Sequence, residues 1–188
     1  MKRQTTMICI SALAMTGIVF LLAGCTTKST EPSLVERGGY LVLVGGCGDC
    51  HSPKVFTAGG PAPDAARLLS GYPASAKLPE IPKGIVGSTQ WGAITTNDFT
   101  AWVGSWGVSF AYNLTPHRAT GIGNWDDALF IKSIRTGKFM GTSRDMLPPM
   151  PWQAMGKIPD EDFKAMFAYL MSLPAIDNAI PEPIPPSQ

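Results

Sequence analysis

The sequence has few of the residues that build common metal sites and disulfide frameworks. Its 188 residues include four cysteines and two histidines, His51 and His117. A structural zinc site needs four Cys or His ligands grouped together, and this chain does not offer such a group. Charges are also sparse and balanced, with 15 basic and 14 acidic side chains and no basic stripe. This balance argues against nucleic acid as a partner.

The first 24 residues are typical of an export signal. Lys2 and Arg3 give a basic start, and the apolar run from Ile8 to Ala23 is too short and wrongly flanked for a spanning helix. The run leads into Leu22-Ala23-Gly24-Cys25, which resembles a bacterial lipobox. We therefore expect 1–24 to be removed and Cys25 to carry lipid, which would hold the protein on a membrane, facing the periplasm or the cell exterior. An uncleaved anchor or a cleaved soluble form are the alternatives.

The remaining cysteines form one local motif, Cys47-Gly48-Asp49-Cys50-His51. Two thiols three residues apart, followed directly by histidine, are the attachment motif of a c-type haem. On a helical turn the three side chains share a face, so Cys47 and Cys50 can form thioethers to the haem vinyl groups while His51 faces the iron. A redox dithiol or half of a zinc site has the same spacing, but the βαβ pattern expected around a redox dithiol is missing. Cys9 would leave with the signal and Cys25 would carry lipid, so no thiol is left for a structural disulfide.

The rest of the chain divides by its pattern of apolar residues, glycine and proline. Helical periodicity predicts helices over 34–46, 125–136 and 159–173. Between the first two, Gly and Pro are frequent, and a stretch rich in Trp, Thr and Val predicts short strands or an extended wrap. The predicted segments are a signal (1–24), a tether (25–33), one folded domain (34–174) and a proline-rich extended tail (175–188).

Two loops carry further candidate residues. The loop over 113–124 is dense in turn formers, and its polar side chains suit either haem propionates or ordinary loop capping. The loop over 138–158 is rich in methionine, which is usually a core filler. However, Pro149 and Pro151 fix the backbone on both sides of Met150. A rigid loop that presents one thioether is what the sixth position of a haem iron requires.

Taken in order, these motifs resemble those of a class I bacterial cytochrome c, in the group with one haem per domain and an Asn-Leu-Thr-Pro loop. The pieces that carry the resemblance are Arg37-Gly38-Gly39-Tyr40-Leu41, Cys47 to His51, Phe99 to Trp106, Asn113-Leu114-Thr115-Pro116, Thr120-Gly121-Ile122-Gly123-Asn124-Trp125, Ile134-Arg135-Thr136-Gly137, Pro148-Pro149-Met150-Pro151-Trp152, Asp160-Glu161-Asp162 and Ala168-Tyr169-Leu170. They cover most of residues 36–174.

The resemblance implies a mainly α fold, the class I cytochrome c fold, with helices packed round one covalent haem and a long irregular, partly extended insertion at about 53–112. The first and last helices would cross, with Gly38 or Gly39 facing Tyr169. The family's axial methionine maps onto Met150. His117 departs from the family, which usually has an acidic residue there, and a bis-histidine haem is the alternative.

We therefore predict a lipid-anchored electron-transfer protein with one haem c, and not an enzyme. His51 would be the proximal ligand and Met150 the distal one. The other expected cofactor contacts are Trp125 and Trp152 in the apolar surround, and Asn113, Thr115 and Arg135 at the propionates. The protein would pass single electrons between a dehydrogenase or respiratory complex and an acceptor. The alternatives are an enzyme that uses the haem directly, and a haem-containing subunit, redox sensor or binding module of a larger membrane complex.

Overall fold

The computed structural model describes residues 31–86 and 88–186, and residues from Pro32 onward form one unit. The predicted signal and Cys25 lie outside the described residues. The helices are α1 (Leu34–Val44), α2 (Cys47–His51), α3 (Asp127–Thr136), α4 (Trp152–Met155) and α5 (Asp160–Ser172), with short 3₁₀ turns at Ala65–Arg67 and Phe139–Gly141. The strands are β1 (Lys54–Thr57), β2 (Gly60–Pro63), β3 (Ala93–Thr95), β4 (Ala101–Gly104) and β5 (Gly107–Phe110).

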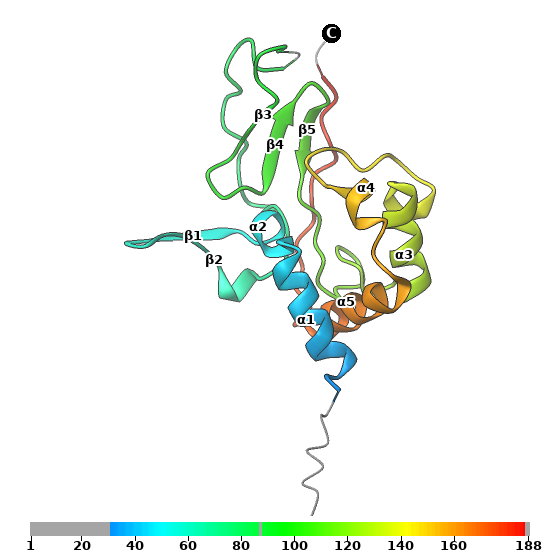
Figure 1. Ribbon diagram of the computed structural model, residues 1–188. Coiled ribbons are helices and arrows are strands. Elements are labelled where there is room, and N and C mark those ends of the chain that lie inside the picture. Colours follow the sequence, from blue (N-terminus) through cyan, green and yellow to red (C-terminus); the bar gives the residue numbers. More distant parts are fainter. Residues whose placement is uncertain (1–30, 87, 187–188) are drawn as a thin grey trace, which may run out of the picture. The chain divides into compact units, whose positions relative to one another are not determined.

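Helix α1 packs across α5, as Figure 1 shows. Ser33 and Glu36 form a capping box that starts α1. A Cβ atom at Gly38 would overlap the carbonyl oxygen of Ala165, and one at Gly39 would lie 3.2 Å from the ring of Tyr169. The prediction that these glycines face Tyr169 is confirmed, because only a missing side chain allows the two helices to approach so closely.

The predicted helices are present with slightly shifted ends. Asp126 is the N-cap of α3, where its carboxylate accepts a hydrogen bond from the Leu129 N–H. Helix α3 therefore begins two residues later than the sequence pattern indicated, and Gly137 ends it in the left-handed conformation. Buried residues from α1, α3, α5 and the loops between them make the core: Val42, Leu69, Ile122, Phe130, Ile134, Phe163, Met166 and Leu170.

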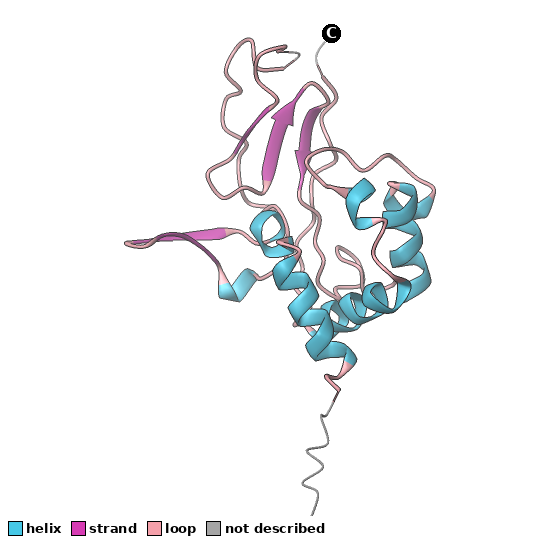
Figure 2. Ribbon diagram, in the orientation of Figure 1, coloured by secondary structure: helices cyan, strands magenta, loops and turns pink. Residues whose placement is uncertain are grey.

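The prediction of a mainly α, class I cytochrome c fold is wrong for the described residues. Figure 2 shows strands beside the helices, and these strands form two antiparallel sheets, β1–β2 and β3–β4–β5. The physical reason is the composition of 93–110. Val103 pairs with Val108 across β4 and β5, and both are buried, which β-branched residues favour. Gly107, at φ +93°, permits the tight connection between the two strands.

The chain after α5 does not end at the helix but runs back across the unit. Ile184 pairs with Val108 through two backbone hydrogen bonds of 2.8 and 3.0 Å. Ile184 therefore forms a single bridge to the β5 edge of the three-stranded sheet, and residues far apart in sequence meet there.

Candidate functional site

One large apolar cavity lies among the helices, the β4–β5 hairpin and the loops before α4. The empty space among its lining residues is about 1290 Å³ when the open mouth is counted, and 27 residues line it. The lining includes side chains from α2, β4, β5, α3 and α5, and from the tail. A cavity lined by so many mainly apolar residues suits a large, mainly hydrophobic cofactor.

Helix α2 delivers the two thiols and the imidazole to this cavity. Cys47, Cys50 and His51 all line it, as the helical spacing of the motif predicted. Gly46 precedes the helix in the left-handed conformation, at φ +65°. This conformation, which glycine adopts without strain, turns the chain sharply from α1 into α2.

His51 has one ring nitrogen committed and one available. Its Nδ1 lies 2.7 Å from the carbonyl oxygen of Tyr112. A carbonyl oxygen only accepts hydrogen bonds, so Nδ1 is the donor and Nε2 carries the free lone pair. Burial lowers the pKa of His51, which favours the neutral ring. A neutral imidazole oriented by a backbone carbonyl is the usual form of a metal-ligating histidine.

The two thiols of α2 are free and lie in an apolar setting. Burial raises the pKa of Cys47 to about 11, and burial also raises that of Cys50. A redox-active dithiol needs the opposite shift, toward thiolate. Among the described residues, no group of three or more Cys, His, Asp or Glu side chains could hold a metal ion, so neither α2 thiol has the companions of a zinc site.

Lys54 stabilises the C-terminal end of α2. Its Nζ donates to the carbonyl oxygens of Gly48, Asp49 and Ser52, at 3.1, 2.8 and 2.5 Å. A cation at the carboxyl end of a helix also interacts favourably with the helix dipole. Burial lowers the pKa of Lys54. Nothing in the sequence motif marks this lysine, which binds α2 from the strand that follows it.

Met150 reaches the cavity from the segment between the 3₁₀ turn at 139–141 and α4. It is one of four lining methionines, with Met146, Met155 and Met166. The segment is tied to the β-sheet, because the Ser109 hydroxyl donates to the carbonyl oxygen of Pro148 at 2.6 Å. The structure therefore places the proline-flanked thioether in the same cavity as His51.

Two tryptophans were expected to contact the haem, and one of them, Trp125, lines the cavity. Its ring packs near Tyr112 and Phe139, with centroids 6.5 and 5.7 Å away. Trp152 is not part of the lining; its ring lies against Gly137, where a Cβ atom would collide with it.

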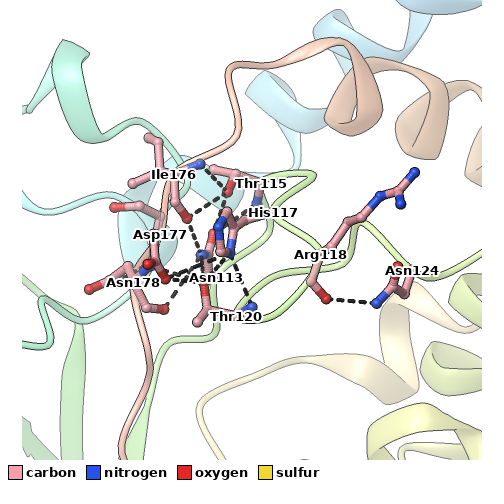
Figure 3. Close-up of polar contacts among 10 residues, drawn as sticks. Asn113, Thr115, His117, Arg118, Thr120, Asn124, Ile176, Asp177 and Asn178 are labelled. Atoms are coloured by element: carbon pink, nitrogen blue, oxygen red, sulfur yellow. Dashed lines mark hydrogen bonds and ion pairs between the residues drawn. The ribbon is translucent and has the colours of Figure 1, made fainter.

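The polar residues expected at the propionates face other parts of the chain. Asn113 and Thr115 are fully buried in a network with the tail, shown in Figure 3. Asn113 Nδ2 donates to the carbonyl oxygen of Ile176 at 2.8 Å, and the Ile176 N–H donates to Thr115 Oγ1 at 3.1 Å. Arg135 donates to the Ile158 carbonyl at 2.9 Å and pairs with Asp160. None of these three side chains lines the cavity.

His117, the alternative iron ligand, also lies outside the cavity lining. Its Nδ1 accepts from the Thr120 N–H at 3.2 Å and lies 3.7 Å from the Asp177 carboxylate. Figure 3 shows it within the network that joins this loop to the tail. It therefore belongs to a structural contact, away from Cys47 and Cys50.

The structure adds one charged lining residue that the sequence pattern did not mark. Arg144 is the one fully charged side chain among the described residues that line the cavity. Its guanidinium lies over the Phe139 ring, 4.8 Å from the centroid. No local motif distinguishes Arg144 from the chain's other arginines, so only the three-dimensional arrangement identifies it.

The donor set fits a c-type haem. Two free thiols three residues apart, a neutral imidazole and a thioether share one large apolar cavity. This combination is that of a c-type cytochrome, in which His and Met bind the iron and cysteine thioethers hold the porphyrin.

Known proteins with similar sequences are consistent with this chemistry. No family model matches the chain. It is 30% identical, over 87% of its length, to the fructose dehydrogenase cytochrome subunit of Gluconobacter japonicus, and covers 28% of that protein. It is 29% identical over 86% of its length to the gluconate 2-dehydrogenase cytochrome c subunit of Pantoea cypripedii, again covering 28%. It is 25% identical over 80% of its length to the cytochrome c subunit of alcohol dehydrogenase (quinone) of Gluconacetobacter polyoxogenes, covering 25%.

The chain thus spans about a quarter of the length of these relatives. Their names support a c-type cytochrome, with haem c as its cofactor. Among the described residues, no helix is both long and apolar enough to cross a membrane.

Proposed function

We propose that this protein is an electron carrier with a single haem c, bound through Cys47 and Cys50, with His51 and Met150 as the two axial ligands. The observation that carries the proposal is the shared cavity, which all four side chains line. Met150 is separated from the motif by about a hundred residues of sequence, yet both face one apolar space. When bound, the haem supplies one-electron Fe(III)/Fe(II) chemistry, and His/Met ligation raises its reduction potential.

The protein's own residues would orient the ligands and exclude water. The Tyr112 carbonyl fixes the tautomer and the direction of the His51 ring. The Ser109 hydroxyl holds the segment that carries Met150. Trp125 and the surrounding aromatic rings keep the cavity apolar, which tunes the potential. With His51 and Met150 both assigned to the iron, no open position is left for a substrate, which favours an electron carrier over an enzyme.

Methionine ligation is tested by near-infrared absorption of the oxidised protein. The sulfur-to-iron band should be present in the parent protein and absent from Met150→Ala. Met155→Ala is the matched control, because Met155 also lines the cavity but lacks a proline on either side. A band that survives in Met150→Ala, or disappears in Met155→Ala, would contradict the assignment.

We further propose that the protein works as a subunit of, or a close partner to, a dehydrogenase complex. The relatives are named as cytochrome subunits of dehydrogenases, which supports this placement and favours it over a freely diffusing shuttle. A redox sensor or binding module of a larger membrane complex is the second candidate. Co-purification of a dehydrogenase that reduces the haem on addition of its substrate supports the first. A stable partner without electron transfer supports the second.

For the position in the cell, we propose removal of residues 1–24, lipidation of Cys25, a tether over 25–33 and a haem domain over 34–174, followed by the tail. The lipobox-like sequence is the support for this proposal. The Cys25→Ser variant should be released from membranes into the soluble exported fraction. Continued attachment of this variant to membranes would indicate an uncleaved anchor instead.

A further inference from the structure

The proposed haem raises the question of how its two propionate carboxylates are held. A carboxylate in an apolar cavity needs hydrogen-bond donors or a cation, because burying an unpaired charge is costly. Asn113, Thr115 and Arg135 are directed elsewhere. Other side chains of the cavity must hold the propionates, a role that rests on the proposed function.

Most polar groups in the cavity wall are already used within the protein. The Ser109 hydroxyl donates to the Pro148 carbonyl at 2.6 Å, and the Ser133 hydroxyl donates to the Leu129 carbonyl at 2.7 Å. The Trp102 indole N–H donates to the Phe99 carbonyl at 2.8 Å. These donors are therefore not available to a carboxylate without breaking a bond to the backbone.

Arg144 is different, because its guanidinium has donors to spare. Its Nε lies 3.3 Å from the Glu182 carboxylate, while an arginine carries five N–H donors in all. The guanidinium also lies over the Phe139 ring, 4.8 Å from its centroid. The Glu182 side chain is 84% exposed, so it can move away or share the guanidinium at little cost. Arg144 already faces one carboxylate at the edge of the cavity.

Tyr112 brings a second donor to the same place. Its ring packs edge-on against Phe139, with centroids 5.0 Å apart, and it lines the cavity beside Arg144. Burial raises the pKa of the Tyr112 hydroxyl; Arg144 acts in the opposite direction, and Glu182 raises it further. A tyrosine hydroxyl is ordinarily protonated near neutral pH, so it can donate, and Tyr112 and Arg144 share Phe139 as a packing partner.

Arg144 and Tyr112 line the same cavity as Cys47 and Cys50, into which a bound haem would extend. The propionates leave the porphyrin on the edge opposite the vinyl groups that cysteines bind. Figure 1 shows α2 and the segment that joins α3 to α4 on opposite sides of the chain continuing from β5. We propose that Arg144 and the Tyr112 hydroxyl form the propionate-binding subsite of the cavity, and that Glu182 of the tail borders it as a competing carboxylate.

The test compares four variants of the full-length chain, produced with the cellular machinery that attaches haem c: Arg144→Gln, Arg144→Lys, Glu182→Gln and Arg135→Gln. Two readouts are the midpoint potential, from optical redox titration, and the propionate bending mode in resonance Raman spectra. Arg135→Gln is the matched control, since it removes the same charge from a site outside the cavity. Haem content by the pyridine haemochrome assay is measured for each.

Removing the Arg144 charge should lower the midpoint potential, because a nearby cation favours the reduced iron, and should shift the propionate mode. Arg144→Lys should keep the potential near that of the parent, and Glu182→Gln should raise it. Arg135→Gln should leave both readouts unchanged. Glu182→Gln also serves as the independent test if Arg144→Gln yields no folded protein.

The outcomes separate this inference from the proposed function. A parent protein without covalent haem overturns the proposed function and the subsite with it. A parent with haem, and an Arg144→Gln variant with an unchanged potential and propionate mode, overturns the subsite alone. A shift of the potential in Arg135→Gln equal to that in Arg144→Gln also overturns it. If Arg144→Gln does not fold, an unchanged potential in Glu182→Gln overturns it.

Discussion

Among single residues, Lys54 shows how a side chain outside the cysteine motif can hold that motif in shape. Three carbonyl oxygens at the end of α2 accept from one ammonium group. A five-residue helix has few hydrogen bonds of its own, and its last carbonyls need partners. Lys54 supplies them at the turn that presents the two thiols and His51.

We therefore expect Lys54→Met to destabilise the protein by about 1–3 kcal/mol, the range for losing hydrogen bonds to a charged group. The free energy of unfolding, from denaturant titration followed by circular dichroism, measures the change. Lys77→Met is the control, since Lys77 is an exposed lysine. Equal stability of the two variants would show that Lys54 is not needed to hold α2.

Among the elements, α1 crosses α5 closely and leads directly into α2. Gly38 and Gly39 sit at the crossing, but they differ in what they face. A Cβ atom at Gly38 meets the backbone of Ala165, which cannot move without shifting α5, whereas one at Gly39 meets only the edge of the Tyr169 ring. The two glycines therefore offer a graded test of how tightly the helices pack.

Gly38→Ala should destabilise the protein by about 1–3 kcal/mol, the usual cost of overpacking. Gly39→Ala should cost less, because the Tyr169 ring can turn aside, and alanine also favours the helix by about 1 kcal/mol. Thermal unfolding of both variants provides the comparison. A larger loss for Gly39→Ala than for Gly38→Ala would contradict the described crossing.

In the molecule as a whole, the tail after α5 contacts both the loop after the first 3₁₀ turn and strand β5. Asn178 Nδ2 donates to the carbonyl oxygens of Ser70 and Tyr72, at 2.7 and 2.9 Å, and its Oδ1 accepts from the Ala74 N–H at 2.8 Å. The tail also pairs with β5 and reaches the cavity mouth through Pro183. It therefore acts as a structural strap across the unit.

Asn178→Ala should lower the free energy of unfolding by about 1–3 kcal/mol, because it removes three hydrogen bonds and leaves part-buried backbone groups unpaired. The control is Asn124→Ala, which loses one exposed bond to the Arg118 carbonyl. Denaturant titration compares the two. If Asn178→Ala were no more costly than Asn124→Ala, the tail would not be the strap described.

Sequence reasoning succeeded where the signal was local. The α3 helix was predictable from its apolar spacing, and the resemblance to known cytochromes implied the close approach of Gly38 or Gly39 to Tyr169. It failed on the fold class, because composition favoured short strands between the first two helices but did not reveal the sheets they form or the bridge from Ile184 to Val108. The same limit applies to the propionate candidates. Arg135 and Arg144 have identical chemistry, and only the folded chain shows which one faces the cavity.

The central claim is one covalent haem per chain on Cys47 and Cys50. The most direct test is the pyridine haemochrome assay on the purified full-length protein, with intact mass and acid-acetone extraction on the same sample. The account predicts one haem per chain that resists extraction, and no covalent haem in the Cys47→Ser, Cys50→Ser double variant. A haem that acid-acetone extracts, or a parent protein without haem, would contradict it.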